Sequence, residues 1–292
     1  MSTFFYLKKT SVIIQNRLIF IRLGINMKLI QTETNIGLIR KKNEDAVIAI
    51  NHPKQKDIIL MAVADGMGGK EHGELASNYV VKTLEKWFKE KDPKTLNNIN
   101  KAKELLENLI YKLNEDIIKK YKENHTGTTL CISLINKSKT LFMNVGDSRG
   151  YIYKNNKLIQ VTEDDSDVWF YYKYGACKKD DLRYFFNNNI ITACIGLTDD
   201  LCKVSSYVTE NDYDISLLFT DGVTDIITDK KIHKLIKKSE KRKILSSIIN
   251  EAVNIDQNLK IPLRLKRKKY SKYILPFKGR DNATGTIYIK EV

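Results

Sequence analysis

Three apolar segments of this chain each end in an aspartate beside a glycine. The aspartates are Asp65, Asp147 and Asp221. A short apolar run bounded by turn residues is typical of a buried strand, so these side chains are expected at the rim of a sheet. The adjacent glycines leave the backbone free to approach a ligand, because glycine has no Cβ atom. Each carboxylate is therefore placed as a ligand for a metal or a substrate would be.

Two further acidic sites flank strand-like segments. Glu44 and Asp45 precede the apolar segment 46–50, and Asp281 precedes the segment 286–289. Five such sites indicate one shared pocket, and carboxylates gathered in one place repel each other unless cations neutralise them. Oxygen ligands of this kind suit Mg²⁺ or Mn²⁺. The alternative is a set of unrelated turn carboxylates, because aspartate is common in turns.

Six short motifs, taken in order, give the chain a resemblance to a known family. They are GLIRKKNED at 37–45, VADGMGG at 63–69 with GELAS at 73–77, GTT at 127–129, VGDSR at 145–149, LFTDGVTD at 218–225 and DNAT at 281–284. In this order they resemble the metal-dependent serine/threonine protein phosphatases of type 2C (PPM), in their bacterial form. The resemblance covers residues 28–292. It implies an α+β fold with four layers in the order αββα, in which two antiparallel β-sheets are flanked by helix pairs, with the catalytic domain at 27–292.

The resemblance also implies a reaction, the hydrolysis of phosphoserine and phosphothreonine by a hydroxide that bridges two divalent cations, Mn²⁺ or Mg²⁺. Two cations lower the pKa of a shared water and screen the charge on the phosphoryl oxygens. The positions that match the family's cation ligands are Glu44, Asp65, the Gly66 carbonyl, Asp221 and Asp281, with Asp147 beside Asp221 at a weaker third site. Asp65 would bridge both principal cations. Asp45 and Asn282 are expected directly behind these ligands.

Arg40 matches the arginine that binds the substrate phosphate in this family. A planar guanidinium can grip two phosphate oxygens at once. Arg40 and Asp65 are therefore the expected catalytic residues. The alternative for Arg40 is a solvated surface charge beside Lys41 and Lys42. Met67 stands where many eukaryotic members have a histidine thought to protonate the leaving group, and bacterial members commonly have methionine there.

The chain departs from the family pattern in the flap, which is expected at about 165–190. Asp165 replaces the histidine of the usual Asp-His-Ser motif. The flap contributes to substrate choice in the family, so its altered sequence leaves the substrate open. The aromatic residues of 169–174 are expected to be packing residues rather than a surface that stacks on nucleic acid bases.

The remaining patterns predict the elements that would hold these residues. Helices are expected at 73–89, 101–122, 229–238 and 242–255, the first two from apolar residues at helical spacing. Strands are expected at 128–135, 140–145, 151–154 and 158–161. Short polar turns between these strands predict an antiparallel meander.

Composition limits the classes of protein that fit. The chain has 292 residues, of which 42% are hydrophobic, and this is enough for one large core. Its net charge of +15 permits attraction to nucleic acid or acidic lipid. Lysine is frequent throughout, however, and no nucleic-acid motif is present, so no nucleic acid partner is expected. The basic segment at about 257–280 is expected to be a solvated insertion.

Residues 1–26 are an N-terminal extension. This extension would be disordered, resemble a presequence, or result from a start codon assigned too far upstream. Their apolar runs are too interrupted by charge to span a membrane. The four cysteines form no Cys-x-x-Cys pair, so a cytoplasmic protein with reduced thiols is expected.

These observations together predict a monomeric, metal-dependent phosphatase whose partners are phosphorylated proteins, among them a serine/threonine kinase and its targets. Two other classes remain as alternatives. A catalytically inactive phosphoprotein-binding module would bind metal or phosphopeptide without turnover. A basic nucleic-acid-binding protein would lose affinity steeply as salt rises.

Overall fold

The computed structural model describes residues 28–68, 72–121, 123, 125–185, 187–254 and 281–291. The extension at 1–26 and the basic insertion at about 257–280 lie outside these residues. The strands are β1 (Leu29–Asn35), β2 (Asp45–Asn51), β3 (Ile59–Gly68), β4 (Thr126–Thr128), β5 (Leu130–Ile135), β6 (Lys139–Val145), β7 (Arg149–Lys154), β8 (Lys157–Gln160), β9 (Ser205–Glu210), β10 (Ile215–Phe219) and β11 (Ala283–Ile289). The helices are α2 (Gly73–Glu90), α3 (Pro93–Asn97), α4 (Ile99–Lys120), α5 (Asp167–Lys173), α6 (Asp221–Thr224), α7 (Asp229–Lys238) and α8 (Ile244–Asn254), with 3-10 turns η2 (Lys179–Tyr184), η3 (Asp199–Leu201) and η4 (Lys241–Lys243).

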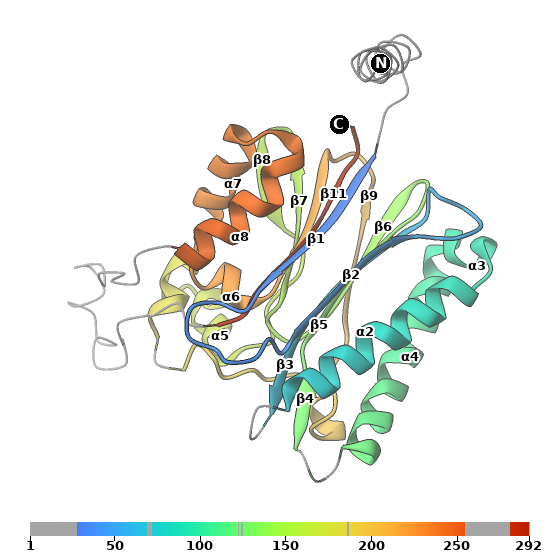
Figure 1. Ribbon diagram of the computed structural model, residues 1–292, viewed down its shortest axis with the longest axis horizontal. Coiled ribbons are helices and arrows are strands. Elements are labelled where there is room, and N and C mark those ends of the chain that lie inside the picture. The colour runs from blue at the N-terminus through green and yellow to red at the C-terminus, as the bar shows by residue number, and fades with distance from the viewer. Residues whose placement is uncertain are drawn as a thin grey trace, which may run out of the picture.

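The described strands form two antiparallel sheets (Figure 1). One sheet has the order β1-β11-β10-β7-β8, and the other has the order β2-β3-β5-β6-β9 with β4 paired to β3. In the first sheet Leu29 lies opposite Ile289, so the first and the last described strands are neighbours. In the second sheet Asp45 lies opposite Asp65.

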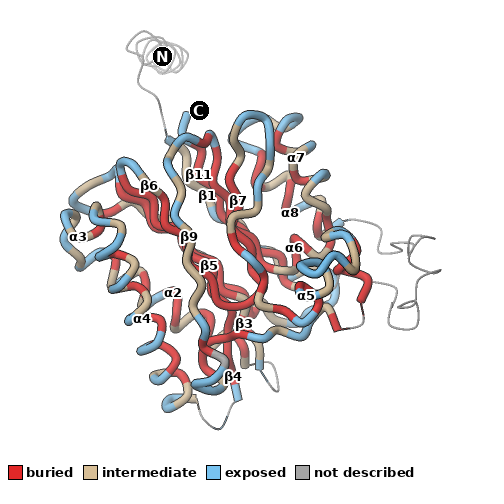
Figure 2. Tube along the Cα trace, turned by 180° about the vertical axis from the view of Figure 1, so that it is seen from behind, coloured by how far each residue is buried: buried red, intermediate tan, exposed pale blue. Residues whose placement is uncertain are grey.

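Helix pairs cover the outer faces of both sheets. Helices α2 and α4 bury side chains such as Leu84 against the sheet that contains β3. Helices α7 and α8 bury side chains such as Ile248 against the sheet that contains β10. A third apolar cluster, which includes Met61, Phe142 and Leu218, fills the space between the sheets. Figure 2 shows the buried residues concentrated along the strands and on the helix faces that meet them. The predicted four-layer α+β sandwich is confirmed.

The predicted helices at 73–89 and 101–122 are confirmed as α2 and α4, and those at 229–238 and 242–255 as α7 and α8. Between α2 and α4 the chain forms the short helix α3, because Asp92 accepts a hydrogen bond from the Lys94 N–H at 3.0 Å and Pro93 suits the first helical position. Asn98 caps α4 in the same way, accepting from the Lys101 N–H at 3.1 Å.

The prediction of one meander was wrong, because the four strands are divided between the sheets. Strands β5 and β6 pair in one sheet, while β7 and β8 pair in the other. The chain crosses between them at Gly146, whose φ of +102° is strained for any residue with a side chain. This crossing carries Asp147 to the place where the two sheets meet.

Strand β3 also differs from its prediction. Asp65 was expected just beyond the end of the strand, but β3 continues to Gly68. At Asp65 the strand that pairs with β3 changes. Strand β3 pairs with β5 up to Val63 and with β4 from Gly66 onward. The predicted strand at 128–135 is accordingly divided at Thr129 into β4 and β5.

Candidate active site

The structure brings four of the predicted carboxylates together where the two sheets meet. Asp45 and Asp65 face each other across β2 and β3. Asp221 begins α6 directly after β10, and Asp281 precedes β11. The charges of Asp221, Asp45 and Asp281 all act on Asp65.

Burial and mutual repulsion raise the pKa values of these groups. Burial raises the pKa of Asp65 well above its ordinary range, and the neighbouring Asp221 and Asp45 raise it further. Burial, together with the charge of Asp281, raises the pKa of Asp221 to about 7. Burial likewise raises the pKa of Asp45. The cluster therefore favours positive charge, either protons or cations.

The oxygen atoms of this cluster fit a divalent cation. Asp45 Oδ1 and Asp221 Oδ1 are buried and have no hydrogen-bond partner in the described part of the chain. A hard cation would satisfy such oxygens and remove the repulsion between the carboxylates. Among the described residues, no three acidic, histidine or cysteine side chains already converge on one ion position.

Arg40 lies at the edge of this cluster. Its Nη2 atom is 2.6 Å from Asp281 Oδ2, and its Nη1 atom is 3.6 Å from Glu44 Oε2. Burial alone would lower the pKa of Arg40, but the hydrogen bond and the charge of Asp281 raise it. Its side chain is 45% exposed, so solvent or a ligand can still reach the guanidinium. The simple alternative of a solvated surface charge does not describe a side chain held between two carboxylates.

Glu44 and Gly66 are fixed against the start of α2. Glu44 Oε1 accepts a hydrogen bond from the Gly73 N–H at 2.8 Å, and the Glu44 carbonyl accepts one from Ser77 Oγ at 2.6 Å. A Cβ atom on Gly66 would lie 2.4 Å from the Gly73 carbonyl oxygen and 2.5 Å from that of Glu44. Glycine is therefore required at position 66, where the backbone of β3 passes next to that of α2 and the Glu44 loop.

Asn282 and Asp45 hold neighbouring segments in place through hydrogen bonds. Asn282 Oδ1 accepts from the Glu44 N–H at 2.8 Å, and its Nδ2 donates to the Ile36 and Lys42 carbonyls at 2.9 and 3.0 Å. Asp45 Oδ2 accepts from Thr220 Oγ1 at 2.9 Å. Asn282 thus connects the start of β11 to the loop that carries Arg40.

Two threonines with no predicted role orient the aspartates. Thr220 binds Asp45, and Thr129 Oγ1 accepts a hydrogen bond from the Asp65 N–H at 3.0 Å. Their positions in the sequence could have indicated these roles, because Thr220 directly precedes Asp221 and Thr129 lies in the GTT motif.

Asp147 faces the same region from the crossing between the sheets. It is 8% exposed, and burial together with the charges of Asp221, Asp164 and Asp225 raises its pKa well above the ordinary range. Asp164 and Asp225 were missed as parts of this region. Asp164 stands in an acidic run and Asp225 ends the motif around Asp221, so both could have been singled out.

The flap rests on the segment that follows Asp221. Asn188 Nδ2 donates to Asp225 Oδ2 at 2.7 Å. The buried Arg183 donates from Nη2 to the Thr224 and Ile227 carbonyls, both at 3.4 Å. These contacts fix the flap beside the carboxylate cluster.

Comparison with known proteins relates this chain to protein phosphatases. The Protein phosphatase 2C family matches residues 40–252. The chain is similar to the serine/threonine phosphatase stp of Listeria welshimeri, at 32% identity over 204 residues that cover 68% of this chain and 79% of that protein. It is similar to the protein phosphatase PhpP of Streptococcus pneumoniae, at 28% identity over 203 residues that cover 68% and 80%.

A solved structure supports the same comparison. The serine/threonine phosphatase Stp1 from Staphylococcus aureus superposes with a TM-score of 0.75 at 26% identity, over 91% of this chain and 96% of that one.

Within the described residues, none of the helices has the length and apolar character needed to cross a membrane.

Proposed function

Because this chain belongs to the protein phosphatase 2C family, we infer that it is a serine/threonine protein phosphatase. Its substrates are phosphoserine and phosphothreonine side chains of proteins. The observation that carries this inference is the cluster of Asp45, Asp65 and Asp221, with two unsatisfied buried oxygens and Arg40 beside it.

The proposed cofactors are two divalent cations, Mn²⁺ or Mg²⁺, with a third that binds more weakly. The proposed ligands are Glu44, Asp65, the Gly66 carbonyl, Asp221 and Asp281, with Asp147 and Asp221 at the third site. When bound, the cations would activate water for attack on phosphorus and screen the phosphoryl charge. The raised pKa values of Asp65 and Asp221 support this assignment, because burial and the neighbouring carboxylates both disfavour their negative charge and bound cations would offset that cost.

Arg40 is the proposed phosphate-binding residue. Its guanidinium is bound to Asp281 and is half-exposed, so a phosphate arriving at the cluster can take over its donors. Two parallel hydrogen bonds to phosphate oxygens would orient the phosphorus toward the carboxylates. Asp45, Asn282 and Thr220 would hold the ligands without contacting the substrate.

We further propose that the protein acts as a monomer in the cytoplasm on phosphoproteins, among them a serine/threonine kinase and its targets. None of the four cysteines in the described residues is joined in a disulfide, as a reducing compartment requires. The catalytic domain is proposed to be 27–292, with the flap at about 165–190.

The test is hydrolysis of para-nitrophenyl phosphate and of a phosphothreonine peptide with Mn²⁺, with Mg²⁺ and with chelator. Asp65→Asn and Asp221→Asn should each lower turnover by at least about 100-fold, because each removes a charged cation ligand. Asp212→Asn is the matched control, since Asp212 is an exposed carboxylate paired with Lys154. Its turnover should equal that of the wild type.

The second candidate is an inactive phosphoprotein-binding module, which the replacement of the flap histidine by Asp165 favours. Folded wild-type protein that binds cations and phosphopeptide but hydrolyses neither substrate would establish that candidate and exclude the phosphatase.

A further inference from the structure

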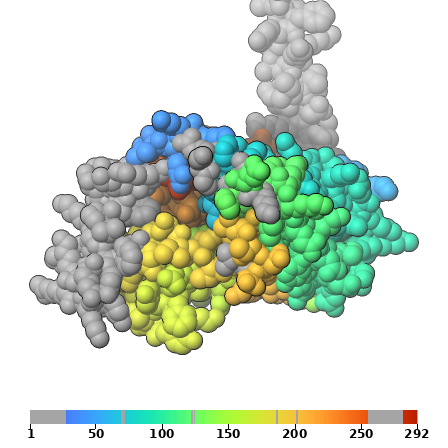
Figure 3. Space-filling model, turned by 90° about the horizontal axis from the view of Figure 1, so that it is seen from below, coloured from blue at the N-terminus to red at the C-terminus, as the bar shows by residue number. Residues whose placement is uncertain are grey.

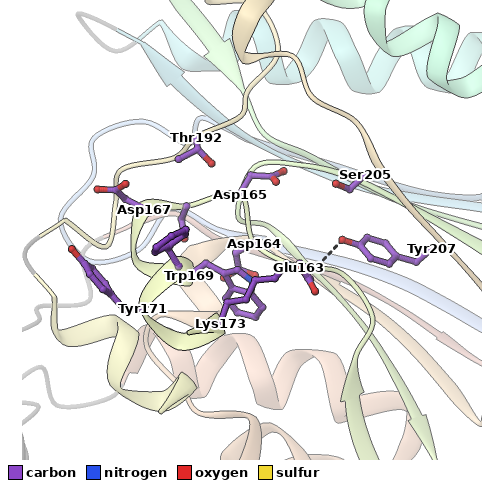
Figure 4. A pocket seen from close by; sticks show the side chains of 12 residues that line it. Glu163, Asp164, Asp165, Asp167, Trp169, Tyr171, Lys173, Thr192, Ser205 and Tyr207 are labelled. Carbon is purple, nitrogen blue, oxygen red and sulfur yellow. Dashed lines mark hydrogen bonds and ion pairs between the residues drawn. The ribbon is translucent and has the colours of Figure 1, made fainter. Parts of the chain in front are cut away.

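A second cavity, which we call the flap pocket, lies between the flap and the edge strand β9. Its volume is about 590 Å³. The flap side is lined by Glu163, Asp165, Asp167 and Trp169, and the strand side by Tyr207. Figure 4 shows these side chains around one opening, with Tyr207 reaching from β9 toward Glu163. No residue of the proposed cation or phosphate site lines this pocket.

The flap pocket carries an excess of negative charge. Asp164 is neutralised by Arg149 at 2.6 Å, and Glu163 by Lys173 at 2.8 Å. In the described part of the chain, neither Asp165 nor Asp167 forms an ion pair with a basic side chain. The described pocket therefore keeps two carboxylates without an ion-pair partner, within a chain whose net charge is +15.

Each of these two carboxylates is oriented by one hydrogen bond. Asp165 Oδ2 accepts from the Gly146 N–H at 3.0 Å, and Asp167 Oδ2 accepts from Asn187 Nδ2 at 3.0 Å. Within the described residues the second oxygen of each side chain has no hydrogen-bond donor, so it can accept from a ligand. Burial raises the pKa of Asp165 to about 6, so it is ionised at neutral pH, and Lys203 is the basic group whose charge reaches it.

Aromatic rings form a further part of the wall, beside Ser166, Lys173, Thr192 and Ser205. Trp169 is 8% exposed and has the Arg149 guanidinium 5.9 Å from its ring centroid, so this ring already accepts a cation. Phe170, at the rim, is 61% exposed and lies 4.2 Å from the ring of Tyr174, which is 70% exposed. The expectation that the aromatic residues of 169–174 would be packing residues holds for Trp169 and is wrong for Phe170 and Tyr174.

The flap pocket adjoins the proposed active site. The Asp165 N–H donates to the Gly146 carbonyl at 2.9 Å, and the Gly146 N–H donates back to the Asp165 side chain. Gly146 directly precedes Asp147, so the residue that Asp165 contacts is next in the chain to a residue of the proposed cation site. The blue loop before β2 and the yellow flap lie at the same end of the molecule in Figures 1 and 3.

We propose that the flap pocket binds a basic side chain of the phosphoprotein substrate, arginine in preference to lysine, a few residues from the phosphorylated residue. Arginine fits both features of the wall, because its planar guanidinium stacks on aromatic rings and forms paired hydrogen bonds with carboxylates. A cavity of about 590 Å³ holds such a side chain and adjoining backbone. The proposal rests on the proposed phosphatase function, whose substrate class it narrows.

The test compares three phosphothreonine peptides that differ at one position, which carries arginine, glutamine or glutamate. The position is moved through the second, third and fourth residues on either side of the phosphothreonine. At the best position, kcat/KM for the arginine peptide should exceed that for the glutamine peptide by about 5- to 10-fold, mainly through KM. High salt should reduce the difference, because ionic attraction is screened.

The decisive variant is the double change Asp165→Asn with Asp167→Asn. It should abolish the preference for arginine while leaving hydrolysis of para-nitrophenyl phosphate unchanged, because that substrate is too small to reach the pocket. The matched control is Asp57→Asn with Asp212→Asn, two exposed carboxylates elsewhere, which should keep the preference. Equal kcat/KM for all three peptides, or a preference that survives the double change, would overturn the pocket proposal and leave the phosphatase function intact.

A binding measurement decides the pocket even if the enzyme shows no turnover. Trp169 lines the pocket and Trp87 is the other tryptophan, so fluorescence in a Trp87→Phe background reports on the pocket. In chelator, the arginine peptide should change this fluorescence at lower concentration than the glutamine peptide, and the double change should remove the difference. Identical titrations for both peptides would refute the proposal. Absence of all hydrolysis, by contrast, would count only against the phosphatase function.

Discussion

Replacing Asp164 by asparagine is expected to destabilise the protein by about 3 kcal/mol. The Arg149 side chain is 7% exposed and that of Asp164 is 2% exposed. Arg149 Nε lies 3.0 and 2.9 Å from the two carboxylate oxygens, and Nη2 lies 2.6 Å from Oδ2. Asparagine keeps the shape and one acceptor but removes the charge, so the guanidinium would remain buried without its main partner.

The size of this effect follows from what remains around Arg149. Removal of one partner of a buried ion pair costs about 3–5 kcal/mol. Asp225 also acts on Arg149, and the nearby Trp169 ring offers a cation–π contact, so the low end of that range applies. The double change Arg149→Met with Asp164→Leu should cost less than either single change, because it leaves no buried charge.

Urea unfolding followed by circular dichroism, in chelator, would measure these changes in the free energy of unfolding. Asp212→Asn is the control, since it breaks an exposed pair with Lys154 and should change stability little. If Asp164→Asn were no more destabilising than Asp212→Asn, the buried pair of Arg149 and Asp164 would not stabilise the fold.

Three further outcomes follow from the geometry. Gly66→Ala should destabilise by about 2–3 kcal/mol and lower activity, because its Cβ would meet backbone atoms at 2.4 and 2.5 Å. Gly68→Ala should be milder in the same unfolding assay, because its nearest contact would be the Thr126 hydroxyl at 3.1 Å. Mn²⁺ at about 100 times its Kd should stabilise the folded protein by about 2.7 kcal/mol in thermal unfolding, and chelator should reverse this; an unchanged melting temperature would contradict the cation site. Burial raises the pKa of Asp165 from 3.8 to about 6, so the folded state binds more protons than the unfolded state between these values. The contribution of Asp165 to the free energy of unfolding is therefore largest below pH 3.8, and it is lost as the pH rises through the folded-state pKa of about 6. After allowance for its partial exposure the loss is about 1–2 kcal/mol, so the stability of Asp165→Asn relative to wild type should rise by that amount from acid to neutral pH.

The sequence could predict the elements whose signals are local. Apolar residues at helical spacing locate α2 and α4 within two residues at each end. The order of the motifs indicates the four-layer fold. The division of β5, β6, β7 and β8 between two sheets could not be predicted, since tight turns look the same whether the next strand pairs with the last or crosses to another sheet. The left-handed backbone at Gly146 makes the crossing, and no local pattern distinguishes it from an ordinary turn glycine.

The candidate site was predictable in its residue types but not in its contacts. A carboxylate beside a glycine at a strand end is visible in the sequence for Asp65 and Asp221. The ion pair of Arg40 with Asp281 joins residues 241 positions apart, and only strand pairing brings them together. Asp225 could have been singled out as the end of the motif around Asp221, but its hydrogen bond with the flap residue Asn188 could not be predicted from the sequence.

The carboxylate cluster exists only because both sheets contribute to it. Asp45 and Asp65 belong to the sheet of β2 and β3, whereas Asp221 and Asp281 flank β10 and β11 of the other. Burial raises the pKa values of Asp65 and Asp221, and the repulsion between these neighbouring carboxylates raises them further and acts to drive the sheet ends apart.

Two kinds of contact oppose this repulsion. Hydrogen bonds cross directly from one sheet to the other, from Thr220 to Asp45 at 2.9 Å and from the Glu44 N–H to Asn282 at 2.8 Å. The apolar cluster of Met61, Phe142 and Leu218 holds the two inner faces together. The packing energy of the sandwich therefore stabilises an arrangement of like charges that is unfavourable by itself, and cation binding would reduce that electrostatic cost.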